Sequence, residues 1–252
     1  DPTNEIQQLS VSSTGDTLHL QNGGFVIVPG ISAANAPVPQ YPAGSVFCAS
    51  GPTAIVDVTN PTTGRIWMDR NLGASQAATS STDANAYGDL YQWGRRSDGH
   101  QCRTSATTTA LSSTDQPAHG SFILAIYDDF LPQDWRSPQN ANLWQGVNGV
   151  NNPCPSGYRL PTEAELNAER FSWNSNNAQG AFASPLKLPV AGVRYNVNGM
   201  LADVGAFGSY WSSATNGVGG IHSQGLFFAS SNAFLNTNDN RASGNSVRCL
   251  KD

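Results

Sequence analysis

Charged residues are scarce in this sequence, at 12% of its 252 residues. Ordinary soluble domains carry about 25%, and small polar residues fill the difference here. The net charge is −5, and no basic run or basic amphipathic helix occurs. The sequence therefore lacks the electrostatic footprint of a nucleic-acid-binding protein and that of a membrane-surface helix. The longest apolar run, residues 122–127, is too short to cross a bilayer, which predicts no membrane insertion.

The short motifs of common catalytic and metal sites are also missing. The sequence contains no His-Glu-x-x-His, no Gly-x-Ser-x-Gly, no phosphate-binding glycine loop and no Cys-x-x-Cys. No two of the four histidines stand at metal-ligand spacing: His19, His100, His119 and His222. We therefore expect a protein that is not an enzyme and needs no cofactor.

Calcium is the one ion that the sequence leaves open. Two groups of residues carry suitable oxygen atoms: Asp83, Asp89 and Asp98, and separately Asn236, Asn238, Asp239 and Asn240. Neither group has the spacing of an EF-hand loop. Asn and Asp in loops more often stabilise turns, so we do not predict a calcium site.

Hydrophobic residues make up 38% of the chain, with six Trp, seven Tyr and ten Phe. This content excludes general disorder. It is enough for one large domain, or for one domain with a smaller second unit.

Four cysteines predict two disulfides and an oxidising compartment. The alternative is four buried free thiols in a cytosolic protein. Pairing Cys48 with Cys102 and Cys154 with Cys249 closes two segments that do not cross. In the loop-entropy model, the longer closure contributes roughly 4–5 kcal/mol. A chain that begins at Asp1 fits removal of a signal peptide or numbering that starts inside a longer protein.

Residues 1–30 have the pattern of a small β unit. Apolar residues alternate with polar ones at Leu9 and Val11 and again at Leu18 and Leu20, and glycine turns separate them from residues 25–28. Strands this short cannot bury a core alone. They must pack on the main domain or on other copies of the chain, which suggests a stalk or a homo-oligomerisation element. Residues 31–45 contain three prolines and predict an extended linker to a main domain at residues 46–252.

Within the main domain, residues 54–58 and 65–69 predict a hairpin. Residues 80–83 could cap a short helix through residues 89–93. Thr162 followed by Glu165 predicts a helix that begins with a capping box. Later strands are expected in five segments: residues 186–190, 193–195, 208–213, 225–229 and 246–250.

Residues 215–243 are polar, rich in Asn and interspersed with aromatic side chains. This is the composition of a recognition surface, because aromatic rings supply contact area at low entropic cost while Asn and Ser adapt their hydrogen bonds. Leu226 and Phe228 are expected in the core instead. We expect a loop-rich binding surface made by Asn216, Val218, Ile221, His222, Gln224, Phe227, Asn232, Phe234, Asn236, Asn238 and Asn240.

Five motifs occur in a fixed order and together resemble one known family. They are Gly-Arg-Ile-Trp-Met-Asp-Arg-Asn-Leu-Gly at residues 64–73, Tyr-Gly-Asp-Leu-Tyr-Gln-Trp-Gly at 87–94, Cys-Pro-Ser-Gly-Tyr-Arg-Leu-Pro-Thr at 154–162, Tyr-Trp-Ser-Ser at 210–213 and Ser-Val-Arg-Cys at 246–249. The series resembles the Fibrobacter succinogenes major paralogous domain. That family is related to formylglycine-generating enzymes and to the variable proteins of diversity-generating retroelements, and the resemblance covers about residues 46–252.

The resemblance implies an α+β, C-type-lectin-like domain with small twisted antiparallel sheets, one or two short helices and abundant ordered loops. It also implies secretion or surface display and a binding role, with ligand-contacting residues between 216 and 240. The calcium-dependent sugar-binding signatures of lectins are absent. The paired active-site cysteines of formylglycine-generating enzymes have no evident counterpart.

Three hypotheses follow for function. The first is an extracellular binding or adhesion module, secreted or displayed on a bacterial cell or a virion, whose partner is a protein or glycan on another surface. The alternative is a structural subunit of a surface filament or phage tail, whose main role is self-assembly. The third is an enzyme of the formylglycine-generating type, which would need a reactive free cysteine.

Overall fold

The computed structural model describes residues 9–11, 17–20, 25–27, 39–49, 51–125, 133–216 and 221–252. The chain divides into two compact units, Asp1–Pro39 and Gln40–Asp252. The first unit contains a three-stranded antiparallel sheet in sequence order: β1 (Leu9–Val11), β2 (Thr17–Leu20) and β3 (Phe25–Ile27). The predicted short β strands of residues 1–30 are confirmed at these positions.

The second unit begins earlier than the sequence suggested. Gln40 exchanges two hydrogen bonds with Ser156: its N–H donates to Oγ at 2.9 Å, and its carbonyl accepts from the Ser156 N–H at 2.8 Å. Tyr41 packs against a buried cluster of the main unit. Residues 40–45, predicted as linker, are therefore part of the main unit, because local proline content does not reveal these distant contacts.

Two four-stranded sheets join distant parts of the main unit. The first has the order β4-β5-β16-β9. Its strands are β4 (Asp57–Thr59), β5 (Ile66–Met68), β16 (Leu250–Lys251) and β9 (Tyr158–Arg159). The second has the order β11-β10-β15-β6. Its strands are β11 (Leu201–Ala202), β10 (Val193–Arg194), β15 (Gly244–Asn245) and β6 (Tyr91–Gln92).

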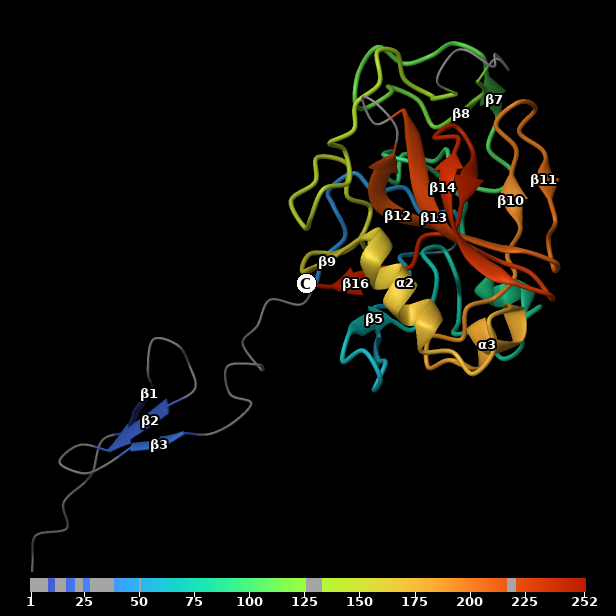
Figure 1. The fold of residues 1–252 in the computed structure, drawn as a ribbon. Helices are drawn as coiled ribbons and strands as arrows, with labels where there is room; N and C mark the ends of the chain where they lie inside the picture. Colours follow the sequence, from blue (N-terminus) through green and yellow to red (C-terminus); the bar gives the residue numbers. More distant parts are fainter. Residues whose placement is uncertain are drawn as a thin grey trace, which may run out of the picture. The chain divides into compact units, whose positions relative to one another are not determined.

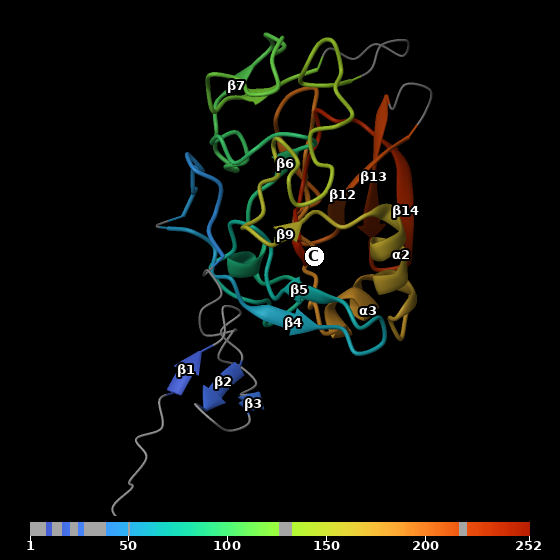
Figure 2. The ribbon, with the colours of Figure 1, turned by 90° about the vertical axis from the view of Figure 1, so that its left-hand side faces the viewer.

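The third sheet of this unit is built from its longest strands, β12 (Gly208–Asn216), β13 (His222–Phe228) and β14 (Ala233–Asp239), in antiparallel order. A short parallel pair, β7 (Thr107–Thr108) and β8 (Phe122–Ile123), completes the strands. Figure 2 shows the β4–β5 hairpin and α3 (Ala178–Ala183) at one end of the unit and β7 at the other.

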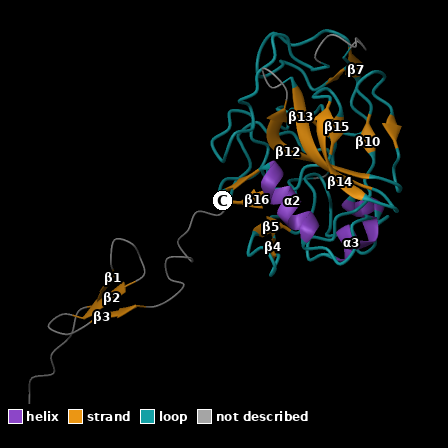
Figure 3. Ribbon diagram, viewed as in Figure 1, coloured by secondary structure: helices purple, strands orange, loops and turns teal. Residues whose placement is uncertain are grey.

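Helix α2 (Glu163–Phe171) begins as predicted. The Thr162 Oγ accepts a hydrogen bond from the Glu165 N–H, and the Glu165 carboxylate accepts one from the Thr162 N–H. The helix lies against β12, β13 and β14 (Figures 1 and 3). Leu166 of α2 belongs to a core cluster with Leu226 and Phe228 of β13.

The predicted helix through residues 89–93 is wrong. A 3-10 turn, η1 (Ala84–Ala86), is capped by Asp83, and the chain then runs as strand β6. Gly88 and Gly94 bracket this strand with φ of 67° and 81°. Such left-handed backbone ends any helix, and β6 pairs with β15 instead.

Residues 186–190, predicted as a strand, are irregular in the structure. The Leu188 N–H donates to the Ala181 carbonyl of α3, and the Val190 N–H donates to Ser81. These partners satisfy the backbone of a buried segment without a neighbouring strand. The hairpin, the helix that begins after Thr162 and the strands predicted at residues 193–195, 208–213 and 225–229 are present with different bounds. The strand predicted at residues 246–250 is largely irregular, and only Leu250 lies in a strand, β16. The carbonyls of this segment at Val247 and Cys249 accept from the Leu72 and Met68 N–H groups instead of from a regular ladder. The observed fold class is α+β.

Both predicted disulfides are confirmed, Cys48–Cys102 and Cys154–Cys249. The second joins the segment before β9 to the segment before β16, two strands that are themselves neighbours. No helix among the described ranges is long and apolar enough to cross a membrane.

Four of the five sequence motifs meet in the buried core around Asn71. Its side-chain oxygen accepts hydrogen bonds from Arg248 at 2.9 and 3.1 Å, and its amide donates to the Tyr87 carbonyl and the Tyr210 hydroxyl at 3.1 Å. Arg248 also donates to the Leu186 carbonyl at 2.7 Å. These motif residues therefore build the frame of the domain.

Candidate recognition surface

The polar segment at residues 215–243 is organised as strands and is less loop-rich than predicted. Strands β13 and β14 occupy most of it. The difference has a physical cause: polar residues such as Ser223 and Thr237 lie in paired strands because their backbone groups complete the sheet. A polar composition alone therefore did not reveal that these residues form strands.

The sheet β12-β13-β14 has two different faces. Leu226, Phe228 and Leu235 point to the core beneath α2. On the opposite face, Trp211 of β12 is buried in a second core cluster and donates from Nε1 to the Tyr91 carbonyl at 2.6 Å. This face becomes more open from β12 towards the edge strand β14, where Phe234 is 43% exposed.

Three phenylalanines contact one another on the open face. The ring centroids of Phe207 and Phe227 are 5.2 Å apart, and those of Phe227 and Phe234 are 5.0 Å apart. None of the three belongs to a core cluster of the described residues. Phe207 is not among the residues predicted for the binding surface. Ser209 pairs with Phe227 and lies on the same face of the sheet. Phe207 precedes Ser209 by two residues, and this period-two spacing is the signal that could have identified it.

Amide side chains continue this surface along β14. Asn236 alternates with Leu235, so it lies on the same face as Phe234. The ladder is irregular between Gly225 and Ser223, and Asn238 follows that irregularity as an exposed residue. Asn236 lies opposite Gly225, which has no side chain to cover it. Asn216 at the end of β12 donates to the Thr237 carbonyl at 3.0 Å and to the Asn238 side chain at 3.4 Å. Strand pairing therefore places Phe227, Phe234 and Asn236 on one face, and hydrogen bonds place Asn216 beside Asn238 farther along the same sheet.

The other predicted residues are less uniformly placed. Ile221 and His222 are partly buried at the start of β13, and Asn232 is exposed between β13 and β14. Asn240 donates to Gln133 at 2.9 Å. Gln224 is only 8% exposed, so its assignment to a binding surface is corrected. Val218 lies outside the described residues.

No Asp, Glu, Lys or Arg occurs between residues 204 and 238. Asp239, at the end of β14, is engaged by the chain itself. Burial raises the pKa of its carboxyl to about 6, against the opposing effect of hydrogen bonds from Asn245 and Asn240. This candidate recognition surface therefore carries aromatic rings and neutral amides rather than formal charge.

The Asp98–His100 pair has the residue types of an acid–base site, but its hydrogen bonds are already used. His100 Nδ1 lies 2.6 Å from Asp98 Oδ1, and Nε2 accepts from the Gln92 N–H at 2.9 Å. Burial, together with the charge of Arg95, lowers the pKa of the imidazole to about 4. This pair therefore has a structural role.

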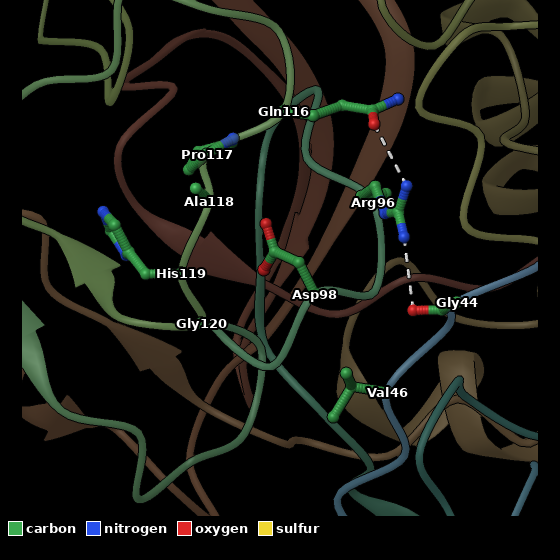
Figure 4. Close-up of a pocket in the computed structure, with 9 residues that line it drawn as sticks. All are labelled: Gly44, Val46, Arg96, Asp98, Gln116, Pro117, Ala118, His119 and Gly120. Carbon is green, nitrogen blue, oxygen red and sulfur yellow. Dashed lines mark hydrogen bonds between the residues drawn. The ribbon is translucent and has the colours of Figure 1, made fainter.

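A pocket of about 440 Å³ lies beside this pair (Figure 4). Arg96 in its wall donates to the Gln116 side chain and to the Gly44 carbonyl. Asp98, also in the wall, accepts from Arg95 at 2.8 and 3.1 Å. The charged groups of this pocket are bound by the protein itself, which leaves little for a ligand.

The Asp83 carboxylate, one of the oxygen-bearing groups considered for calcium, is occupied by hydrogen bonds within the chain. Asp83 accepts hydrogen bonds from Thr79, Gln76 and Asn85. In the described part of the chain, no three His, Cys, Asp or Glu residues gather in a metal-binding arrangement.

Comparison with protein-family models, with curated proteins and with solved structures finds no match to this sequence. The assignment of a function therefore rests on the geometry of the chain.

Proposed function

We propose that this chain is an extracellular binding or adhesion module with a C-type-lectin-like fold. Its recognition surface is the open face of β13 and β14 with the adjoining Phe207. The observation that carries the proposal is the cluster of Phe207, Phe227 and the exposed Phe234 outside the core, with neutral amides beside it. Exposed rings cost solvation free energy unless a partner covers them, and such patches mark interaction sites.

The rest of the domain supports this role because it holds the sheet β12-β13-β14 in place on the face opposite the proposed surface. One face is buried under α2, and the Cys154–Cys249 disulfide closes the segment that contains all three strands. Changes on the open face can therefore alter recognition without disturbing the core. The small antiparallel sheets, the two helices and the strand order that places β16 between β5 and β9 support the proposed fold family. Two disulfides support an oxidising, extracellular setting.

The first prediction tests this surface with the triple variant Phe234→Ala, Asn236→Ala and Asn238→Ala. A partner is first selected by probing arrays of cell-surface glycans and proteins with the wild-type chain. We expect the triple variant to lose at least about tenfold in affinity, because truncating a central aromatic contact costs on the order of 1–2 kcal/mol. The melting temperature should stay nearly unchanged, since none of these side chains enters the core.

The matched control is Phe171→Ala with Asn174→Ala, which removes an exposed aromatic residue and an exposed amide elsewhere. Affinity of the control should equal that of the wild type. Retention of binding by a folded triple variant would show that recognition lies on another surface.

A further inference from the structure

A second pocket lies away from the recognition surface, beside the Cys48–Cys102 disulfide. It has a volume of about 410 Å³ and lies between this disulfide, the turn at Gly73, the η1 segment and Arg103. None of the residues that line it belongs to β12, β13 or β14.

The carboxyl group of Asp89 forms part of the pocket wall. The side chain is only 6% exposed. Within the described residues, no donor of the chain makes a hydrogen bond to the Asp89 carboxylate oxygens. These oxygens are nevertheless not completely enclosed by protein atoms. They therefore face the pocket. By contrast, the buried Asp134 accepts from Gln139 and Arg136.

The backbone around Asp89 is shaped to hold this carboxyl. Gly73 adopts φ of 82°, and a Cβ built there would lie 2.2 Å from Asp89 Cγ. Only glycine leaves room for the carboxyl at this position. The Asp89 N–H donates to the Leu72 carbonyl at 2.8 Å, which fixes the residue in place.

Arg103 supplies positive charge nearby but directs hydrogen bonds elsewhere. Its Nε donates to the Gly88 carbonyl at 2.7 Å, and Nη2 donates to the Ala191 carbonyl at 2.9 Å. Burial raises the pKa of Asp89 to about 7, and the charge of Arg103 opposes that effect. An ionised Asp89 therefore needs hydrogen-bond donors that the described residues do not provide.

We propose that this pocket binds a primary ammonium group, with Asp89 as its counter-ion. An ammonium carries both the charge and the N–H donors that the carboxylate lacks, whereas a neutral hydroxyl supplies one weaker hydrogen bond. A divalent cation needs several oxygen ligands, and among the described residues Asp89 is the only carboxylate in the wall of this pocket. The group belongs either to a small free amine or to a lysine side chain of a peptide.

The second prediction is tested by calorimetric titration of the full chain with n-butylammonium, with 1-butanol as the neutral probe of similar shape. We expect wild-type protein to bind n-butylammonium and to bind 1-butanol at least about tenfold more weakly. Asp89→Asn keeps the shape of the side chain and should lose affinity by a similar factor. Glu163→Gln, which removes an acid on α2 outside the pocket, should bind as the wild type does.

The pH dependence provides an independent readout. Ammonium binding requires ionised Asp89, so affinity should be about tenfold tighter at pH 8 than at pH 6 in the wild type, given a carboxyl pKa of about 7. The interacting groups are Arg103, which stays charged, and Tyr91, whose raised pKa keeps it neutral over this range. The Asp89→Asn variant should show no such change.

A titration with Nα-acetyl-lysine methylamide separates the two sources of the amine. Tighter binding than n-butylammonium indicates a peptide lysine, and weaker binding indicates a small free amine. Equal binding of 1-butanol, equal binding by Asp89→Asn, or no binding of n-butylammonium to the wild type overturns the proposal. The triple variant of the recognition surface should retain this site, so the two proposals can fail separately.

Discussion

Arg248 shows how single buried side chains hold this molecule together. The residue is 2% exposed, and its guanidinium donates to Asn71, Leu186 and Met68. A buried cation is tolerated only when its donors and its charge are matched by nearby acceptors. Asn71 provides one such acceptor and joins Arg248 to Tyr87 and Tyr210.

The third prediction follows from this position. Asn71→Ala should lower the free energy of unfolding by roughly 2–4 kcal/mol, because the buried Arg248 charge loses one of its acceptors and the Tyr87 carbonyl and Tyr210 hydroxyl each lose a hydrogen bond. Urea denaturation followed by tryptophan fluorescence measures the loss. Asn174→Ala, at an exposed position, is the control and should change little. A loss from Asn71→Ala no larger than that of the control would show that the network contributes nothing to stability.

Helices and strands of this protein differ in how strongly their local sequence determines their conformation. Helix α2 begins where a local signal places it, since Thr162 and Glu165 are three residues apart and satisfy each other's backbone. Strand β6 depends on β15, more than 150 residues later in the chain, so its local helix signal is overridden. The helix signal at residues 89–93 failed for this reason, and α3 was not predicted at all.

The fourth prediction concerns the start of α2. Thr162→Ala should reduce stability by about 1 kcal/mol, because the Glu165 N–H loses its acceptor at the helix N-terminus. Thermal unfolding monitored by circular dichroism measures the effect. Thr82→Ala, at an exposed position outside the helices, is a suitable control. Equal melting temperatures for the two variants would contradict a stabilising capping box.

The chain as a whole divides into two compact units. This division is relevant to the alternative function, in which the chain assembles with copies of itself. Unit Gln40–Asp252 contains all the described core clusters and both disulfides. Unit Asp1–Pro39 contains only a three-stranded sheet of short strands among its described residues. Strands of three or four residues bury little apolar surface, so we expect this sheet to gain stability by packing on other copies of the chain.

The fifth prediction is therefore that removing residues 1–38 converts a homo-oligomer into a monomer. The melting temperature of the remaining unit should not change, since its core is complete. Light scattering after size-exclusion chromatography gives the mass, and calorimetry gives the unfolding transition. A full-length chain that is already monomeric would count against the structural-subunit alternative, and a truncated chain that unfolds without cooperativity would contradict the division into units.

The sequence by itself determined the features that depend on neighbouring residues or on simple counting. These are the capped helix at Thr162, the early hairpin, the short strands near the N-terminus and the pairing of four cysteines without crossing segments. It also identified the aromatic and amide composition of the proposed recognition surface, because composition needs no coordinates.

Only the tertiary structure decided which of those residues share a surface. Register places Phe227 opposite Phe234 and leaves Asn236 opposite Gly225, while it buries Gln224. The unpartnered carboxyl of Asp89 was equally hidden, because its environment is made by Gly73 and Arg103 from different loops. Burial and hydrogen-bond satisfaction are properties of packed neighbours, and a linear sequence does not show which distant residues those neighbours are.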